Sequence, residues 1–249
     1  MASDPHPRFA FFDLDGTLLP WDTQLMFCNH VLHRHGWRRV LLVPFFLCLP
    51  LAALRILRSR MLKRFFLSYL AGMDRAALGD LATAFAADVA RHHVWPGMRA
   101  ELEARRAGGC VLVLNTASPD IYAEAIAREL GFHHCVATRV EIGTRMRVFP
   151  QITGPNNKRA AKISAMRERG ILPPGTDLPI PGSWAYTDSV VDVPLLECAE
   201  HGRLVHPSPA FAAAGIQRGW QILRPDPGMT RTRWRLAALT MLLGFWKYP

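Results

Sequence analysis

Paired cysteines and repeated segments are both missing from this sequence. The five cysteines are an odd number, and none of them stands in a CxxC or other metal-ligand spacing. This argues against a disulfide framework and favours reduced, mostly structural thiols in the cytoplasm. Seven histidines, which complete no metal-ligand spacing either, we interpret as surface residues without a site: His30, His33, His35, His92, His93, His133 and His134.

Acidic residues are scarce relative to basic ones. The chain has 30 Lys and Arg against 20 Asp and Glu, which gives a formal net charge of +10. A surface with this charge attracts anions such as phosphates, nucleic acid or acidic lipid headgroups, and charge alone does not choose among them. Half of the 249 residues are apolar, which is enough to build a full hydrophobic core.

A secretory signal is also lacking. Residues Met1–Arg8 include Asp4 and two prolines, and they lack the basic and then apolar layout of such a signal. We therefore expect the folded body to stay on the cytoplasmic side.

What the sequence does contain is three apolar runs that each end in polar residues. Phe9–Phe12 leads into Asp13-Leu14-Asp15-Gly16-Thr17, and Cys110–Leu114 leads into Asn115-Thr116-Ala117-Ser118-Pro119. The weaker run Trp184–Tyr186 leads into Thr187-Asp188-Ser189. With helical stretches between the runs, the pattern predicts a three-layer, Rossmann-like α/β domain with a parallel sheet. Its ligand crevice should lie beyond the carboxyl ends of the strands.

The segment between the first two strands is too long for one crossover helix. Residues Leu18–Gly109 look helical almost throughout, which predicts an inserted helical cap. Residues Val136–Pro155 alternate and contain turn residues, which predicts a hairpin beside the crevice. The expected division is a core of residues 1–17 and 106–225, a cap of residues 18–105, and a basic and apolar tail of residues 226–249.

The pair Asp13 and Asp15 has the spacing that phosphoryl transfer requires. Two residues apart at the end of a strand, the two carboxylates point to the same side and can act on one substrate. An unprotonated Asp13 can take up the phosphoryl group, while Asp15 can protonate the departing oxygen and later activate water. Gly16 lets the chain turn beneath them, and Thr17 can hold the turn through its hydroxyl.

A second carboxylate pair and two polar groups complete the candidate site. Asp188 and Asp192 suit a hard cation such as Mg²⁺, which binds through few carboxylates, waters and a phosphate oxygen. Thr116 can donate to a phosphate oxygen at the start of a helix. Lys162 is the expected cation beside the phosphorylated aspartate, and Lys158, one helical turn earlier, is the alternative.

In order along the chain, the motifs FFDLDGTL, LNTASP, a lysine and YTDSVVDVPLL resemble the haloacid-dehalogenase-like (HAD) superfamily, in particular its phosphoserine-phosphatase-like branch. The resemblance spans Phe9 to about Leu223. It implies a nucleophile, a general acid/base, phosphate-binding residues and magnesium ligands. By the resemblance, Asp13 is the nucleophile and Asp15 the general acid/base, while Thr116 and Lys162 bind phosphate. The implied magnesium ligands are Asp13, Asp15, Asp188 and Asp192. Two positions depart from the family, which often has Gly where this chain has Arg159 and Thr187.

The cap contains an apolar segment that needs an explanation. Val40–Leu54 has fifteen residues without a charge. Basic residues flank it on both sides: Arg38 and Arg39 before it, and Arg55, Arg58, Arg60, Lys63 and Arg64 after it. The segment is shorter than the roughly 20 residues of a spanning helix, and we expect Pro44 and Pro50 to break it, so a single transmembrane pass is not expected. Either it forms the core of a cap bundle or it dips into one leaflet at an anionic membrane face, where each nearby basic residue adds about 1 kcal/mol. The tail repeats the pattern, with three arginines followed by the apolar stretch Leu236–Trp246. We favour membrane association.

Within the superfamily, the cap segment and Tyr186-Thr187-Asp188-Ser189 resemble the phosphatidylglycerophosphatase C family. That resemblance implies a lipid substrate, phosphatidylglycerophosphate, at the cytoplasmic side of the bacterial inner membrane. Expected partners are therefore a phosphorylated substrate, an anionic phospholipid, and the membrane surface, with no nucleic acid; oligomeric state stays open. Three alternatives remain: a soluble phosphatase for a small ester such as phosphoserine or histidinol phosphate, a phosphomutase, and a catalytically idle membrane-binding module.

Overall fold

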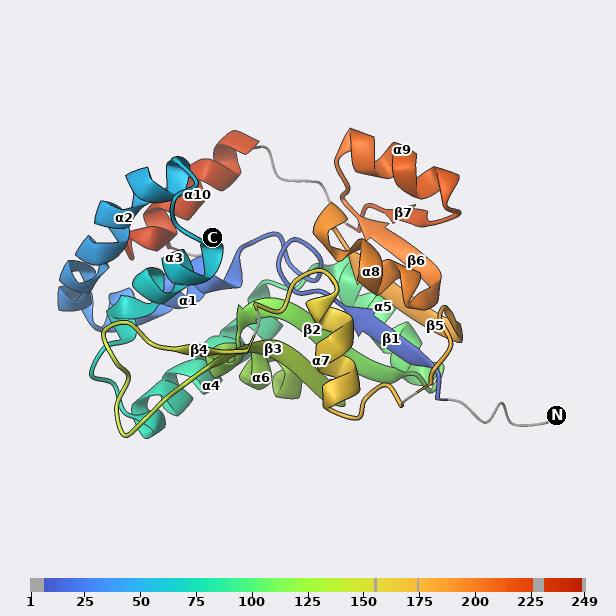
Figure 1. Ribbon diagram of the computed structural model, residues 1–249, viewed down its shortest axis with the longest axis horizontal. Helices are drawn as coiled ribbons and strands as arrows, with labels where there is room; N and C mark the ends of the chain where they lie inside the picture. Colours follow the sequence, from blue (N-terminus) through green and yellow to red (C-terminus); the bar gives the residue numbers. More distant parts are fainter. Residues whose placement is uncertain (1–6, 155, 174, 226–230, 248–249) are drawn as a thin grey trace.

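A mostly parallel sheet forms the centre of the molecule, a computed structural model that describes residues 7–154, 156–173, 175–225 and 231–247. The strands are β1 (Phe9–Phe12), β2 (Val111–Pro119), β3 (His134–Val140), β4 (Ile152–Thr153), β5 (Ile180–Thr187), β6 (Ala199–Val205) and β7 (Gln221–Leu223). They lie in the order β4-β3-β2-β1-β5-β6-β7, and only β3 and β4 pair antiparallel (Figure 1). The predicted α/β class is confirmed.

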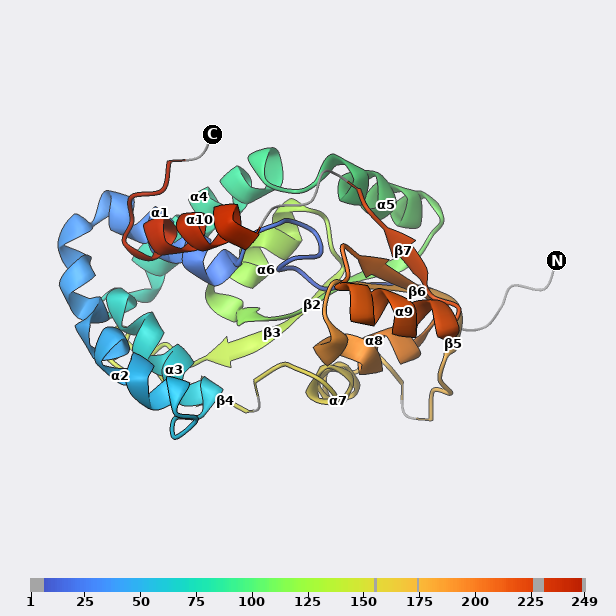
Figure 2. The ribbon, with the colours of Figure 1, turned by 90° about the horizontal axis from the view of Figure 1, so that it is seen from above.

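Helices cover both faces of the sheet. On one face lie α4 (Arg75–His92), α5 (Pro96–Ala107) and α6 (Asp120–Glu129), and on the other lie α7 (Ala161–Glu168), α8 (Val193–Glu197) and α9 (Pro209–Gln217) (Figure 2). Successive residues of β1 alternate between the two cores: Ala10 and Phe12 enter the first, Phe9 and Phe11 the second. Every β1 side chain is thus buried, which is why the run is continuously apolar.

The predicted strands and hairpin are present with longer or shorter bounds. β2 continues past Leu114 through the polar residues to Pro119, with an irregular register to β3, and β5 begins four residues before Trp184. In the hairpin, β4 has only two residues, and its Ile152 and Thr153 pair with Val140 and Arg139.

The long insertion after β1 is helical, as expected. It contains α1 (Thr23–Arg34), the 3₁₀ helix η1 (Gly36–Leu42), α2 (Val43–Ala53), α3 (Ser59–Phe66) and the 3₁₀ helix η2 (Leu67–Leu70) before α4 and α5. Asp22 caps α1 by accepting hydrogen bonds from the backbone N–H groups of Gln24 and Leu25. Buried residues of α1 and α4 belong to the same core as one face of the sheet. The predicted cap range therefore includes helices that pack directly on the catalytic body.

The C-terminal helix α10 (Arg231–Leu242) packs on this insertion and lies beside α1 (Figure 2). Asn29 exchanges hydrogen bonds with the backbone of Trp246 at 3.0 and 3.1 Å, and Arg39 donates to the carbonyl of Leu243 at 2.7 Å. The tail predicted over 226–249 is thus attached to the cap through α10. Its residues 226–230 and 248–249, and residues 1–6 of the predicted core, lie outside the described residues.

Helix α2 has no buried residue, although it is apolar on all sides. The exposed apolar surface of α2, as we call it below, consists of side chains from the helix and its two flanks. They are Val40, Val43, Phe46, Leu47, Leu49, Leu51, Leu54 and Ile56. Phe45 is the side chain that anchors the helix, through a ring contact with Phe66 of α3 at 5.0 Å. The expectation that both prolines break the segment is wrong: Pro44 lies in the first turn, where its missing N–H costs little, and Pro50 lies within the helix.

Part of the basic flank of α2 is structural. Arg38 is buried and donates to the carbonyls of Tyr69 and Ala71, and Lys63 donates to the carbonyl of Ala117. The basic side chains that remain exposed after α2 are those of Arg55, Arg58 and Arg60.

Two of the histidines interpreted as surface residues, His30 and His93, are buried. His30 lies against Phe27 and Phe85. The sequence pattern alone did not reveal the burial of His30, because only the fold shows that α1 places this side chain against α4.

Candidate active site

Asp13 and Lys162 form the centre of the site at the carboxyl end of the sheet. Asp13 follows β1, and its backbone N–H donates to the carbonyl of Tyr186 on the neighbouring strand β5 at 3.0 Å. Lys162, on α7, is 1% exposed, and its Nζ lies 2.8 Å from Asp13 Oδ1 and 2.8 Å from Asp192 Oδ2. Burial lowers the pKa of Lys162, but the charges of the two carboxylates outweigh burial and raise it. The lysine therefore stays protonated.

Asp15 is held on the other side of the turn. Its two carboxylate oxygens accept hydrogen bonds from the backbone N–H of Thr23 and from the Ser118 hydroxyl, each at 2.7 Å. Burial, followed by the charge of Asp22, raises the pKa of Asp15 to about 6. Ser118 was not predicted, but it stands two residues after Thr116 on β2, and that alternation was the signal available.

Gly16 brings the first motif close to Asp188. Its φ is +74°, and a Cβ added there would lie 2.5 Å from Asp188 Oδ2. The neighbouring Thr17 hydroxyl donates to Asp188 Oδ1 at 3.2 Å and accepts from the Asp188 backbone N–H at 3.0 Å. The hydroxyl expected to hold the turn thus also joins β1 to β5.

Five of the predicted residues line one cavity of about 230 Å³. They are Asp13, Asp15, Thr116, Asp188 and Asp192, with Lys158 at the same cavity and Lys162 behind Asp13. Residues more than a hundred positions apart thus meet at the edge predicted from the strand ends. Thr116 is buried and accepts a hydrogen bond from the Ser118 backbone N–H at 3.0 Å.

The four carboxylates predicted as magnesium ligands do not form a ready-made cage. Among the residues that the structure describes, no group of three or more His, Cys, Asp or Glu side chains could hold a metal by itself. Hydrogen bonds engage both oxygens of Asp15 and one oxygen of Asp192.

Asp13 and Asp188 nevertheless fit a magnesium ion. Burial and the negative charge of Asp13 raise the pKa of Asp188 to about 7, so a cation between the two would relieve their repulsion. Mg²⁺ completes its coordination with waters and phosphate oxygens and needs few side-chain ligands. These two aspartates, with Asp192 through its second oxygen, would hold it.

The two departures from the family pattern are accommodated locally. Arg159, where the family often has Gly, has a φ of +57° and so keeps a left-handed turn, at a cost of about 1 kcal/mol for a residue with a Cβ. Before that turn, the buried Asn157 amide donates to the carbonyls of Thr116 and Val136 at 2.8 and 3.0 Å, which fixes the start of the loop that leads into α7 and Lys162. Thr187 is buried and accepts from the Ser189 backbone N–H at 3.1 Å.

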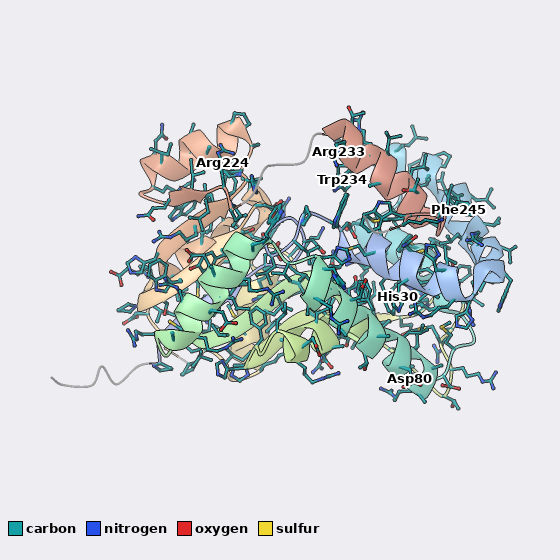
Figure 3. The ribbon with its side chains drawn as sticks, turned by 180° about the vertical axis from the view of Figure 1, so that it is seen from behind. His30, Asp80, Arg224, Arg233, Trp234 and Phe245 are labelled. Atoms are coloured by element: carbon teal, nitrogen blue, oxygen red, sulfur yellow. The ribbon has the colours of Figure 1, made fainter. Side chains whose placement is uncertain are left out.

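A second, larger cavity of about 600 Å³ adjoins the first. It shares Asp15, Asp22 and Asp188 with the catalytic cavity and extends between side chains that sequence reasoning did not select. These are Pro20, Trp21, Trp95, His206, Arg224 and Trp234. Trp234 comes from α10 and Arg224 from the segment after β7 (Figure 3). No motif joins these residues along the chain, so only the fold brings them together.

The fold and the aspartate-lined site define a hydrolase of the type that carries its nucleophile after the first strand. The haloacid dehalogenase-like hydrolase family matches residues 10–197, and the chain belongs to this family. It is therefore an enzyme, and two of the relatives described next are phosphatases by name.

The chain is 29% identical over 224 residues to the probable phosphatase Rv3661 of Mycobacterium tuberculosis, covering 86% of this chain and 74% of that protein. It is 26% identical to phosphoserine phosphatase SerB1 of the same organism, covering 86% of this chain and 69% of that one. A protein of unknown function from Bordetella pertussis has a similar structure, with a TM-score of 0.73, 28% identity and coverage of 88% and 99%. A phospho-aspartyl intermediate analogue of phosphoserine phosphatase shares the fold, with a TM-score of 0.57, 15% identity and coverage of 90% and 96%.

Proposed function

We propose that this HAD phosphatase removes the phosphate of an anionic phospholipid, phosphatidylglycerophosphate, while bound to a membrane surface. The observation that carries the lipid assignment is α2, an apolar helix without a single buried residue in the same fold as the catalytic cavity. The aspartate-lined cavity supports the phosphatase chemistry independently of the lipid.

The residues present can carry out the reaction in two steps. Lys162 occupies Asp13 Oδ1, which leaves Oδ2 to attack phosphorus; the bond from phosphorus to the ester oxygen breaks, and that oxygen takes a proton from Asp15. Asp15 then takes a proton from a water that attacks the phosphorus, which releases phosphate and restores the Asp13 carboxylate. Thr116 offers its hydroxyl to a phosphate oxygen. A bound Mg²⁺ would neutralise charge on the phosphoryl oxygens.

Lys162 fits the phosphate-site cation better than Lys158. Lys162 is buried and contacts both Asp13 and Asp192, whereas Lys158 is exposed at the cavity and makes no ion pair among those found in the described residues. A buried cation beside the nucleophile stabilises charge far more than a solvated one.

Helix α2 supports contact with a membrane. A helix that is apolar on all sides is stable either inside a protein core or in lipid, and α2 meets the core on one side only, through Phe45. Leu47, for example, is 72% exposed. Contact with acyl chains would bury this surface at roughly 25 cal/mol per Å².

The segment suits a position within one leaflet better than a full crossing. Within the described residues, one helical stretch, Gly36–Ala53, is long and apolar enough to span a membrane by length and composition alone. The start of the stretch and the helix that follows it are both tied to the folded protein, because Arg38 bonds to Tyr69 and Lys63 of α3 bonds to the end of β2 at Ala117. A crossing would separate Arg38 from the residues after Ala53 by the membrane thickness. The exposed Arg55, Arg58 and Arg60 then lie where the helix returns toward anionic headgroups.

A soluble ester such as phosphoserine or histidinol phosphate is the second candidate. The likeness to SerB1 supports it. A soluble substrate leaves the exposed apolar surface of α2 without a function, and the cavity of about 600 Å³ is larger than the serine part of phosphoserine needs.

The test is turnover by purified protein with Mg²⁺. We expect release of phosphate from phosphatidylglycerophosphate in anionic vesicles, at a kcat/KM well above that for phosphoserine and histidinol phosphate. A clear preference for either soluble ester, with no hydrolysis in vesicles, would replace the lipid assignment by the second candidate.

A further inference from the structure

The larger cavity beside the catalytic one has no role in the phosphoryl chemistry itself. We call this cavity the indole pocket; its lining includes Trp21, Trp95, Trp234, His206 and Arg224. We infer that the indole pocket binds the alcohol part of the substrate and selects alcohols that carry an anionic group of their own. The inference deepens the proposed phosphatase function and rests on it for the direction of the reaction.

The position of Asp15 places the leaving group in the indole pocket. Asp15 lines both cavities, and Asp188 also stands at their junction. The phosphoryl group must lie beside Asp13, and the ester oxygen must lie within reach of the proton on Asp15. The rest of the alcohol then extends past Asp15, away from Asp13, which does not line the indole pocket.

The lining of the indole pocket specifies the chemistry of its occupant. Three indole rings and Pro20 offer apolar, flat surfaces, while Arg224 and His206 are the basic side chains. The acidic side chains, Asp15, Asp22 and Asp188, all lie toward the catalytic cavity. An anionic group on the alcohol is therefore repelled at the inner end and attracted by the Arg224 guanidinium.

The walls of the indole pocket are fixed by contacts behind them. Trp95 lies 4.7 Å from the ring of His206, and its backbone N–H donates to the carbonyl of Leu18 at 3.0 Å. Trp21 packs against Trp246 with ring centroids 4.8 Å apart. His206 has a φ of +43°, an unusual conformation for a residue with a Cβ, and its N–H donates to the Leu223 carbonyl at 3.0 Å. A rigid wall of this kind loses little entropy when a ligand binds.

Helix α10 links this pocket to the apolar part of the cap. Trp234 lines the pocket, while Leu236 and Leu239, further along the same helix, are exposed. In Figures 1 and 2, α10 extends from the side of the sheet toward the end of the molecule where α2 lies. An alcohol with an anionic group and acyl chains can thus occupy the pocket while its chains follow α10 outward.

Two sources can supply an alcohol with its own anion: the phosphodiester of a lipid headgroup, and the carboxylate of a hydroxy amino acid. Glycerophosphoglycerol, the deacylated headgroup of phosphatidylglycerol, and L-serine represent them as soluble probes. Because three indoles line the pocket, binding can be followed through tryptophan fluorescence without any turnover.

We expect glycerophosphoglycerol to change the fluorescence of the full-length protein saturably. Arg224→Gln should weaken its binding about tenfold, since a charge-assisted contact is lost, and Trp234→Ala should reduce the amplitude. Arg128→Gln, at an exposed arginine on α6, and Trp37→Ala, at an exposed tryptophan on η1, are the matched controls and should bind as the parent does. Saturable binding of L-serine alone, weakened by the same Arg224 change, would assign the pocket to an amino acid source.

Kinetics separate this inference from the proposed function. We compare kcat/KM for glycerophosphoglycerol phosphate with kcat/KM for acetyl phosphate, whose leaving group is small. The ratio of the first to the second should be about tenfold lower in Arg224→Gln than in the parent protein. Binding that depends on Arg224, without hydrolysis of the lipid in vesicles, would keep the pocket and remove the lipid substrate. Lipid hydrolysis and probe binding that are both unchanged in Arg224→Gln and Trp234→Ala would overturn the pocket and leave the proposed function standing.

Discussion

The carboxyl edge of the sheet and helix α2 break the usual rule of protein burial in opposite directions. At the edge, Asp13, Asp192 and Lys162 are charged side chains that are almost fully buried. In α2, an apolar helix has no buried residue, and most of its large side chains are exposed. Most soluble domains avoid both conditions, because a buried charge and a large exposed apolar patch each cost free energy.

The two regions differ in what offsets the free energy cost of their unusual burial. The buried charges satisfy each other within the chain, through two ion pairs of 2.8 Å. Helix α2 packs on α3 through Phe45, but the side chains of its exposed apolar surface stay open to solvent. The charges of the first region are therefore balanced within the chain, whereas we propose that a membrane surface covers the second.

The largest effect is expected from Asp13→Asn, which removes the oxygen that we propose as the nucleophile and preserves the shape of the side chain. Turnover of any ester should fall by about a thousandfold or more. Asp80→Asn, at an exposed position on α4 remote from the site (Figure 3), is the control and should retain full activity. If a folded Asp13→Asn protein kept even a tenth of the activity, the covalent mechanism would have to be abandoned.

The next largest effect is expected from replacing Lys162, with Lys158 as the comparison. Lys162→Met leaves two buried carboxylates without their cation, so we expect a loss of roughly a hundredfold or more in kcat and about 3–5 kcal/mol in the free energy of unfolding. Lys158→Met, at the exposed rival, should cost less than tenfold. Urea unfolding and phosphate release measure both. The reverse order of effects would move the phosphate-site cation to Lys158.

A smaller effect should follow from crowding Asp188. Gly16→Ala places a Cβ against Asp188 Oδ2, and misplacing a catalytic group by about 1 Å costs on the order of a hundredfold in rate. Gly72→Ala is a matched control, because Gly72 has a similar φ of +77° and open space around it. Both variants share the backbone strain. Equal activity in the two would show that the Gly16 contact has no catalytic consequence.

The smallest effect tests the buried part of the cap. Burial, followed by the charge of Arg34, lowers the pKa of His30 to about 4, below its ordinary 6.5. The unfolded chain therefore binds a proton at higher pH than the folded one, and the free energy of unfolding should fall by up to about 3 kcal/mol as pH drops from 6.5 to 4.

The matched pair His30→Phe and His134→Phe isolates that contribution, since His134 is exposed. The first variant should lose this part of the pH dependence in denaturant titrations, and the second should keep it. Parallel pH profiles for the parent and His30→Phe would mean that His30 titrates normally.

The sequence predicted the site better than the cap. Asp13, Asp15 and Asp188 follow apolar strands directly, and parallel strand ends must meet at one edge, so local patterns located them. Ser118 and Asn157 hold the site through contacts across the sheet that carry no local signature. The indole pocket was out of reach for the same reason.

In the cap, the apolar run was visible but its surroundings were not. Composition alone is the same for a buried bundle and for an exposed helix, and only tertiary packing shows that α2 has no buried residue. Arg38 and Lys63 show the converse error: counted as surface charge in the sequence, they are buried or bonded to backbone carbonyls.

The most direct test of the account is one double variant, Leu47→Asp with Leu51→Asp, at two exposed positions of α2. The control is Leu178→Asp with Ile216→Asp, at exposed apolar positions outside the cap. Sedimentation with anionic vesicles and turnover of acetyl phosphate are measured on the same preparations. We predict that the α2 variant leaves the vesicles while it still hydrolyses the soluble ester, because charge is costly only in an apolar environment, and that the control stays bound. Loss of both binding and soluble turnover in the α2 variant, or unchanged vesicle binding, would contradict the membrane account.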